Sequence, residues 1–183
     1  MQRHKGHLRM HDTASYWDRY AQGMKEQTPQ EAVKNAFGWC QYPGHGPGDE
    51  LLGDPMSTLE LGFGHGNAVA ALAAKGIDAT GIDVSPAQYE QALARWGHLT
   101  GAHFAQTDAA DYLASAERQW EAVYSIWGAL WFTDPDILLP LIRNRLRQLG
   151  EVGDYGHASH FNNAPQSTRS LTPSPAHAGV NPI

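Results

Sequence analysis

The 183-residue chain is poor in the features that mark secreted and membrane proteins. Its single cysteine, Cys40, excludes an internal disulfide, and nothing in the composition indicates an oxidising compartment. Long hydrophobic runs are also missing: the longest alanine-rich stretch covers only residues 68–74, whereas a membrane-spanning helix needs about 20 apolar residues. The polar first residues lack the apolar centre of a signal peptide. We therefore expect a cytoplasmic protein with no membrane partner.

Positive charge is scarce as well. The chain has 13 Lys and Arg residues against 19 Asp and Glu residues, which gives a formal net charge of −6. No basic stripe is present to neutralise a phosphate backbone, so we expect no nucleic-acid partner. With 42% hydrophobic and 17% charged residues, the composition is that of a globular chain, and the length suits one domain of ordinary size.

The most informative segment is 57–66, Ser-Thr-Leu-Glu-Leu-Gly-Phe-Gly-His-Gly, an apolar run followed by alternating glycines. This pattern is typical of a strand that turns into a helix while a ligand lies against the backbone, because Gly62, Gly64 and Gly66 carry no Cβ. The dinucleotide pattern G-x-G-x-x-G is absent, since Asn67 stands where its last glycine would fall. The turn is therefore not built for a pyrophosphate. A merely flexible loop is the alternative that the glycines alone leave open.

Two acidic residues extend the pattern. Glu60 precedes the glycines and would repel a pyrophosphate, but it suits a ligand with a positive amino group and a sulfonium, which is the charge pattern of S-adenosylmethionine. Asp83 ends the next apolar run, 19 residues after Gly64, where an acid at the tip of a second strand can accept both ribose hydroxyls. With these acids, the segment favours a nucleoside-binding site over a flexible loop.

Residues 57–150 alternate between strand-like and helix-like patterns, which predicts an α/β fold with a mostly parallel sheet and helices on both faces. We expect four strands, at 57–61, 78–83, 102–106 and 121–125. Helices are expected at 67–75 and after a capping box at 85–88. Asp134-Pro135 is expected to form a turn, and because proline disfavours a helix interior, the last helix should begin at Pro140, with these residues inward: Leu141, Ile142, Leu146 and Leu149.

Residues 13–56 are expected to form an N-terminal helical cap. Its first helix shows apolar residues at helical spacing, and this face either packs into the core or forms a lid over a ligand: Tyr16, Trp17, Tyr20, Ala21 and Met24. A capping box at 28–31, with proline at the first helical position, begins the second helix. Residues 1–12 should be a flexible tail that carries His4, His7 and His11. Because no carboxylate or cysteine cluster joins these histidines, we predict no metal site.

Four segments of the chain, in the order in which they occur, resemble motifs of a known family. Residues 59–66 are similar to motif I of the class I S-adenosylmethionine-dependent methyltransferases, and residues 81–85 are similar to the acidic loop that follows it. Residues 106–109 resemble the third motif, and residues 120–135 resemble the strand-four segment of bacterial small-molecule methyltransferases. The resemblance covers about residues 16–150. It implies a Rossmann-like fold, S-adenosylmethionine as cofactor, and methyl transfer as the activity.

The resemblance also implies roles for single residues. Glu60 and the glycine backbone would hold the methionine part of the cofactor, and Asp83 would bind the ribose hydroxyls. Val84 would offer an apolar face to adenine. Asp108 would accept a hydrogen bond from the adenine amino group, while the backbone at Ala109 would meet the edge of the ring.

The end of the fourth strand is implied to face the reacting methyl group through Tyr124 and Ser125, because open parallel sheets bind ligands at this edge. Trp127 and Trp131 follow that strand, and we expect both to pack in the core, as amphipathic aromatic side chains commonly do.

The implied reaction is an in-line displacement of the sulfonium methyl by a nucleophile on the acceptor. It needs alignment and exclusion of water more than a strong catalytic group. A general base is needed only for a protonated acceptor, and His65, His98 and His103 are equal candidates, so no catalytic residue is assigned. No Pro-Pro pair follows the fourth strand, as it does in adenine-methylating DNA enzymes, which favours a small-molecule acceptor.

The chain departs from the family after Leu146. Arg147 to Gly150 replaces the usual Pro-Gly-Gly turn, and residues 151–183 show no helical or strand period, so we expect a polar, disordered tail and a sheet without its C-terminal strands. The fourth strand would then be an exposed apolar edge, so we expect the protein to self-associate, to expose dye-binding surface or to be marginally stable, with weak or absent methyl transfer. Two explanations are open: a truncated or frame-shifted product, and a diverged version of the family whose acceptor domain is missing.

Two other functions are consistent with the sequence. A non-catalytic module would keep the S-adenosylmethionine pocket but lack the acceptor site, and cofactor binding without turnover would identify it. An NAD-dependent dehydrogenase would share the fold and Asp83, but the glycine spacing disfavours it.

Overall fold

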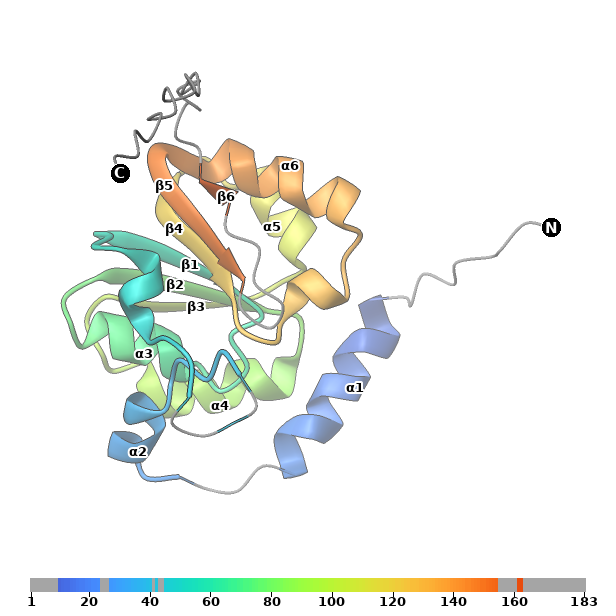
Figure 1. Cartoon of the computed structure of the whole chain (residues 1–183). Helices are drawn as coiled ribbons and strands as arrows, with labels where there is room; N and C mark the ends of the chain where they lie inside the picture. Colours follow the sequence, from blue (N-terminus) through green and yellow to red (C-terminus); the bar gives the residue numbers. More distant parts are fainter. Residues whose placement is uncertain (1–9, 24–26, 41, 43–44, 155–160, 163–183) are drawn as a thin grey trace, which may run out of the picture.

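The computed structural model describes residues 10–23, 27–40, 42, 45–154 and 161–162. Within them, six strands form one sheet in the order β3-β2-β1-β4-β5-β6 (Figure 1). The first five are parallel and β6 is antiparallel, which confirms the α/β, Rossmann-like fold. The strands are β1 (Ser57–Leu61), β2 (Asp78–Asp83), β3 (Ala102–Gln106), β4 (Trp120–Ser125), β5 (Leu146–Asp154) and β6 (Phe161–Asn162).

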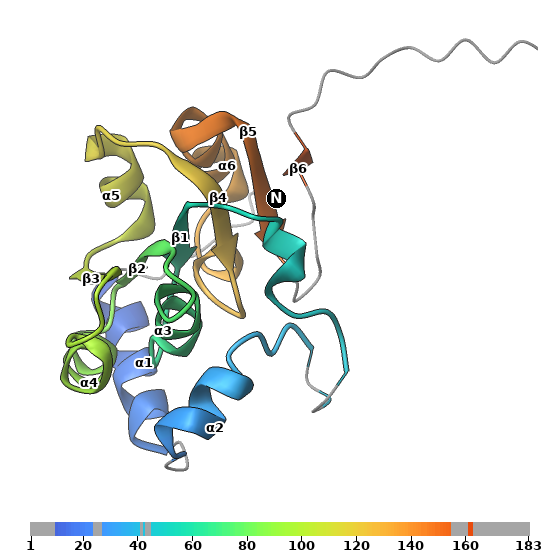
Figure 2. The ribbon, with the colours of Figure 1, turned by 90° about the vertical axis from the view of Figure 1, so that its left-hand side faces the viewer.

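Helices cover both faces of the sheet. Residues of α3 and α4 pack on one face, and residues of α5 and α6 pack on the other (Figures 1 and 2). The helices are α1 (Met10–Gly23), α2 (Pro29–Lys34), α3 (Asn67–Ala73), α4 (Pro86–Trp96), α5 (Ala109–Ser115) and α6 (Pro135–Arg145), with short 3-10 turns η1 (Asp49–Leu52) and η2 (Ala129–Trp131).

The central strand β1 is buried along its whole length, as expected for a parallel strand with helices on both sides. Leu59 and Leu61 are fully buried on the α5 and α6 face, among Ile82, Val123 and Leu138. Four strands have the predicted bounds, apart from one residue at the start of β4, because short apolar runs between turn residues define them.

The last helix begins earlier than the sequence predicts. Asp134 is its N-cap, with a side-chain oxygen that accepts from the N–H of Asp136 at 3.0 Å, and Pro135 occupies its first turn. Pro140 lies inside α6 on the exposed side, where water can bind the carbonyl that proline leaves unpaired. The prediction that Pro140 starts the helix is wrong. Helix α5 was not predicted at all.

A fifth strand lies where the sequence predicts a helix end and a tail. β5 pairs in parallel with β4, from Ala122 opposite Glu151 to Ser125 opposite Asp154. β4 is therefore paired on both sides, and the predicted bare edge, which was the reason to expect self-association, is wrong. The boundary expected at Gly150 falls inside β5. Of residues 151–183, the strands take 151–154 and 161–162, and the others lie outside the described residues.

The N-terminal segment forms the expected helices. In α2, the side chain of Thr28 accepts from the N–H of Glu31 at 3.3 Å, while the Glu31 carboxylate accepts from the Thr28 N–H at 3.0 Å, which confirms the capping box. α2 packs on α3, and α1 packs on α4. Met24, His4 and His7 lie outside the described residues, and the same holds for the side chain of His11.

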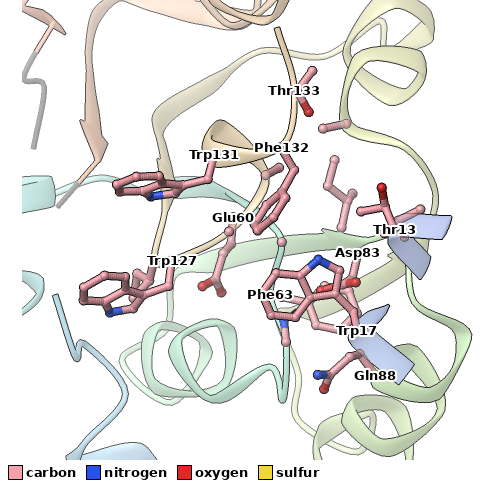
Figure 3. Close-up of a pocket in the computed structure, with 18 of the residues that line it drawn as sticks. Thr13, Trp17, Glu60, Phe63, Asp83, Gln88, Trp127, Trp131, Phe132 and Thr133 are labelled. Carbon is pink, nitrogen blue, oxygen red and sulfur yellow. The ribbon is translucent and has the colours of Figure 1, made fainter. Parts of the chain in front are cut away.

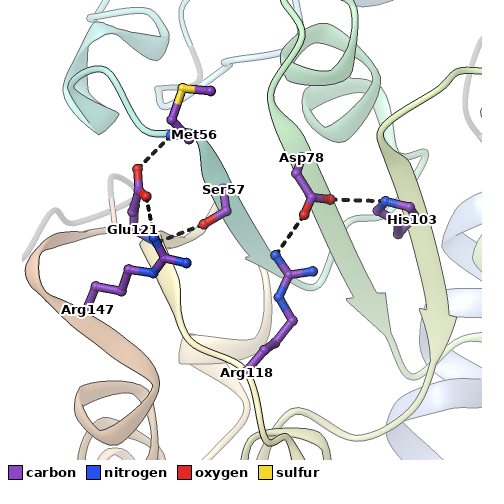
Figure 4. A network of polar contacts seen from close by, with 7 residues as sticks. All are labelled: Met56, Ser57, Asp78, His103, Arg118, Glu121 and Arg147. Carbon is purple, nitrogen blue, oxygen red and sulfur yellow. Dashed lines mark hydrogen bonds and ion pairs between the residues drawn. The ribbon is translucent and has the colours of Figure 1, made fainter.

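Exposed ion pairs connect the amino-terminal ends of the strands (Figure 4). The Asp78 carboxylate accepts from Arg118 at 2.9 Å and lies 3.0 Å from Nε2 of His103. Glu121 accepts from the N–H of Met56 at 2.7 Å and from Arg147 at 2.8 Å. Each exposed pair contributes little to stability. Their position leaves the opposite end of the sheet free for a ligand. In the described part of the chain, none of the helices has the length and apolar character to cross a bilayer.

Candidate functional site

A cavity of about 880 Å³ lies at the carboxyl ends of β1, β2 and β4 (Figure 3). It is lined by the turn after β1, the end of β2, the start of α5, the segment 126–134 after β4, and one side of α1. Since β1 lies between β2 and β4, the strand order reverses at this point, and this is where open parallel sheets bind ligands.

The three glycines of the turn have different surroundings. A Cβ on Gly62 would lie 3.0 Å from the Cα of Gly128, and a Cβ on Gly66 would lie 2.6 Å from the ring of Phe104. These two glycines therefore allow close packing inside the protein. A Cβ on Gly64 would meet no atom within 4 Å, although its φ of +54° also favours glycine. Only Gly64 faces open space, so a ligand that lies against the turn would lie there.

Asp83 fixes this turn to the second strand. One carboxylate oxygen accepts from the N–H of Gly64 at 2.9 Å, and the other accepts from the N–H of Ser85 at 2.9 Å. The side chain is 8% exposed, and burial raises its pKa, with a smaller contribution from the charge of Asp18, while the backbone hydrogen bonds lower it. Each oxygen keeps a lone pair, so the carboxylate can still accept from ligand hydroxyls.

Glu60 is a second buried acid in the cavity. It is 3% exposed, and the hydroxyl of Tyr124 donates to Oε2 at 3.4 Å. Burial raises the pKa of Glu60 well above its ordinary value, and the charge of Asp83 raises it further. No Lys or Arg is found among the described residues that line the cavity. A positively charged ligand group next to Glu60 would restore its ionised form.

The predicted adenine contacts also line the cavity: Val84, Asp108 and Ala109. Asp108 has an additional structural role, since it is the N-cap of α5, and its Oδ1 accepts from the N–H groups of Ala110 and Asp111 at 2.8 and 3.2 Å. Its Oδ2 has no partner among the described residues and is available to a donor.

Three predicted site residues do not line the cavity. Gly66 serves packing, as described above. Tyr124 is 1% exposed and packs against Trp39, with the ring centroids 6.2 Å apart, so it reaches the cavity only through Glu60. Ser125 is fully buried, and its hydroxyl donates to the carbonyl of Leu61 at 2.6 Å. The structure does not bring the side chains of Tyr124 and Ser125 to the position that the resemblance implies.

An aromatic wall lines the cavity instead, with side chains from α1 and from the segment after β4. We use this name for Tyr16, Trp17, Tyr20, Trp127, Trp131 and Phe132, all of which line the cavity. Trp127 and Trp131 are 43% and 48% exposed, so the expectation that they pack in the core is wrong. In Figure 3 both lie on one side of Glu60, whereas Asp83 and Gln88 lie on the other side.

The backbone of Trp127 has an uncommon conformation. Its φ of +53° places a bulky residue in the left-handed region, and Nε1 of the indole donates to the carbonyl of Gly38 at 2.7 Å. Such strain is common where a protein positions a ligand contact. Trp127 and Trp131 follow a parallel strand, and this position is the sequence signal that could have indicated a ligand contact. Hydrophobic periodicity does not predict the direction in which the side chains of a loop point.

Helix α1 carries three residues of the aromatic wall and borders the cavity. The ring of Trp17 meets that of Phe132 edge to face, with centroids 5.2 Å apart. The Asp18 carboxylate accepts from the hydroxyl of Ser85 and from the N–H of Ala87, which attaches α1 to the start of α4 beside Asp83. Of the two readings that the sequence left open for α1, the lid over a ligand is the one that its cavity-lining aromatic residues support.

The family follows from a comparison with known proteins. The model of the methyltransferase domain family matches residues 58–150, just over half of the chain. The chain belongs to this family. A trans-aconitate 2-methyltransferase of Methylobacterium radiotolerans is 39% identical over 88 residues, which are 47% of this chain and 32% of that protein. The chain therefore spans about a third of the length of that relative.

Solved structures agree with the methyltransferase-domain fold. The DhpI complex with S-adenosylhomocysteine has a TM-score of 0.55 and 21% identity, and covers 78% of this chain and 66% of that one. Phosphoethanolamine N-methyltransferase 1 of Haemonchus contortus, with phosphoethanolamine and S-adenosylhomocysteine, has a TM-score of 0.54 and 17% identity, and covers 82% of this chain and 34% of that one. At these identities the likeness concerns the fold.

Gln88 also lines the cavity of this methyltransferase domain, and the sequence did not reveal this position. Its backbone N–H donates to the hydroxyl of Ser85 at 3.1 Å, but no reciprocal side-chain bond forms, so only half of the predicted capping box exists. The side chain is 2% exposed and lines the cavity, and its Oε1 has no hydrogen-bond partner among the described residues. A buried amide oxygen without a donor is costly, and a ligand N–H or O–H would satisfy it.

The three histidines that the sequence left as equal candidates for a general base lie in different places. His65 lines the cavity, and burial, followed by the charge of Arg95, lowers its pKa, which favours the uncharged imidazole. His103 pairs with Asp78 at the opposite end of the sheet, and His98 does not line the cavity of the methyltransferase domain. In the part of the chain that the structure describes, no group of three or more His, Cys, Asp and Glu residues could hold a metal ion.

Proposed function

We propose that this domain transfers the methyl group of S-adenosylmethionine to a small-molecule acceptor. The observation that carries the proposal is the pair of buried acids, Glu60 and Asp83, on either side of an open glycine turn in a cavity with no described Lys or Arg. Such a site suits a cationic nucleoside and disfavours a pyrophosphate.

The residues fit the cofactor part by part. Glu60 and the backbone around Gly64 would hold the methionine part, whose amino group and sulfonium are positive. Asp83 would accept from the ribose hydroxyls with the lone pairs that the backbone leaves free. Val84, Ala109 and the free oxygen of Asp108 would contact adenine.

Bound S-adenosylmethionine would supply a methyl group that is activated by its sulfonium. The protein's share is to align the acceptor and exclude water, since displacement in line needs little else. The strand order supports a cofactor and an acceptor at neighbouring positions in the cavity. Asp83 ends β2, Glu60 lies on the central β1, and the aromatic wall residues 127, 131 and 132 follow β4. An acceptor against that wall would lie on the methionine side of the cofactor, with α1 as a lid.

A small-molecule acceptor is supported by the aromatic contact between α1 and the segment after β4. The rings of Trp17 and Phe132 meet across the cavity, which limits the room for a polymer. The formal charge of −6 is unfavourable for a nucleic-acid acceptor. The relative from Methylobacterium radiotolerans is named for a small acceptor, trans-aconitate.

Calorimetry and a transfer assay together test the proposal. We expect S-adenosylmethionine and S-adenosylhomocysteine to bind and NAD to give no heat. Transfer of a labelled methyl group from S-adenosylmethionine to an acceptor would establish catalysis. Binding without transfer to any acceptor would instead favour a non-catalytic module, and tighter binding of NAD would contradict the proposal.

A further inference from the structure

We propose that the acceptor is an amine on an apolar or aromatic skeleton, and that polycarboxylates such as trans-aconitate are excluded. This inference rests on the proposed function and names the substrate class of the same cavity. Three properties of the cavity support it: the sign of its charges, the kind of its apolar surface, and the position of both relative to the cofactor part.

The charges in the cavity are of one sign. Four acids line it, Glu60, Asp83, Asp108 and Asp134, and none of its described lining residues is Lys or Arg. His65 is the histidine among the described lining residues, and burial lowers its pKa, which favours the uncharged imidazole. An acceptor with several carboxylates would meet repulsion here, and it would find no cation to replace its water shell.

Aromatic side chains supply much of the apolar surface. Tyr16, Trp17, Tyr20, Trp127, Trp131 and Phe132 line the same cavity, and the faces of such rings attract cations as well as flat apolar groups. Phe132 and Trp17 meet at right angles, so they present both an edge and a face. An ammonium group on an aromatic or alicyclic skeleton can use both properties.

Acidic and aromatic residues occur together in the segment after β4, where we place the acceptor. Asp134 belongs to the same segment as Trp131 and Phe132, and its Oδ1 caps α6 by accepting from the N–H of Asp136. Its Oδ2 has no hydrogen-bond partner among the described residues. A carboxylate with a free oxygen thus lines the cavity beside the aromatic wall, where it can bind an ammonium N–H.

The charge balance of the reaction agrees with this surface. The ammonium first loses a proton to water, and the nitrogen lone pair then attacks the methyl carbon. The carbon–sulfur bond breaks with its electron pair going to sulfur, so the positive charge moves from sulfur to nitrogen. The acids and rings stabilise a cation before and after transfer. A carboxylate acceptor would end as a neutral ester, and these acids would oppose its binding.

The test compares acceptors that share a ring and differ in charge. The protein is saturated with S-adenosylhomocysteine, and binding of tryptamine, indole-3-acetate and trans-aconitate is measured by calorimetry. We expect tryptamine to bind at least about tenfold more tightly than either acid, the size of one favourable charge contact. Equal or tighter binding of indole-3-acetate or trans-aconitate would overturn the proposed class.

A matched pair of variants tests the place of the contact. Asp134→Asn keeps the capping oxygen but removes the charge, and we expect it to weaken tryptamine binding about fivefold with unchanged S-adenosylhomocysteine binding. Asp136→Asn, on an exposed position of the same helix outside the cavity lining, should change neither. An equal loss in both variants, or none in Asp134→Asn, would refute the assignment of Asp134.

The two proposals fail in different ways. If S-adenosylhomocysteine itself does not bind, the proposed function fails. If it binds and either acid binds as tightly as the amine or more tightly, only the acceptor class is wrong. Methyl transfer to tryptamine or to another arylalkylamine, but not to the matching acids, would support both.

Discussion

Asp83, the last residue of β2, accepts a hydrogen bond from the backbone N–H of Gly64, which lies in the turn after β1. The acid that is expected to bind ribose therefore also holds the loop that is expected to contact the methionine part. One carboxylate couples the two halves of the proposed cofactor site, and this coupling sets the first prediction.

Asp83→Ala should weaken S-adenosylhomocysteine binding by about 1 to 3 kcal/mol, because a charged acceptor for two hydroxyls is lost. It should also loosen the turn, since the N–H groups of Gly64 and Ser85 lose their partner. Calorimetry measures the first effect and thermal unfolding the second. An unchanged dissociation constant in a folded variant would remove Asp83 from the site.

Substitutions of two glycines in the turn should separate an effect on stability from an effect on cofactor binding. Gly62→Ala should destabilise the protein by about 1 to 3 kcal/mol, because its Cβ meets the backbone of Gly128. Gly64→Val should leave much of the fold intact, at a strain of about 1 to 2 kcal/mol, but abolish cofactor binding, because its side chain enters the cavity. Denaturant unfolding and calorimetry on both variants check this. Retained affinity in folded Gly64→Val would show that the ligand lies elsewhere.

Gln88→Met should change stability and affinity in opposite directions. Loss of the unpartnered buried oxygen should raise the free energy of unfolding of the apo protein by about 1 kcal/mol, while affinity for S-adenosylhomocysteine falls. Gln106→Met, at an exposed position outside the cavity lining, is the matched control. A variant that is more stable and binds equally well would mean that Gln88 makes no ligand contact.

The pKa of Glu60 predicts a pH dependence. Because burial raises it in the folded state, the folded protein holds this proton more tightly than the unfolded chain does. The associated stability is fully present below the ordinary value of 4.5 and is lost as the pH rises from there through the raised pKa. Glu60→Gln should therefore flatten this loss in denaturant unfolding as the pH rises above 4.5.

Binding should show the reverse trend, since a cationic ligand prefers ionised Glu60. Affinity of the wild type for S-adenosylmethionine should rise over the same pH range, and that of Glu60→Gln should change less. A parallel rise in both proteins would assign the effect to another group, with Asp83 the next candidate because its pKa is raised too.

The central strands of the sheet could be predicted from the sequence, but the fifth strand could not. β1 and β2 are short apolar runs bounded by turn residues, so their limits could be read directly. β5 reads Leu-Arg-Gln-Leu-Gly-Glu-Val-Gly-Asp, with apolar residues every three positions and two glycines, a pattern closer to a helix or a loop than to a strand. Its pairing with β4 is a tertiary effect that local pattern does not report.

The site was predictable where the backbone determines it. Glycine spacing and strand-end acids indicated Gly64, Glu60 and Asp83, because these positions follow from the connection of strand to helix. Ser125 was placed in the site by resemblance, but β4 is buried on both faces, so alternation does not tell which of its side chains reaches the cavity. Gln88 could be recognised only from its burial and its missing partner.

Amide hydrogen exchange with and without S-adenosylhomocysteine tests the proposed cofactor site most directly. Binding should slow exchange at residues 62–66, 83–88 and 108–111 and across α1, because the ligand would contact the turn and the lid would close on it. Residues 118–121, at the amino-terminal end of the sheet, should show no change beyond that of global stabilisation. Protection confined to other segments, or no protection at saturating ligand, would contradict the proposed site.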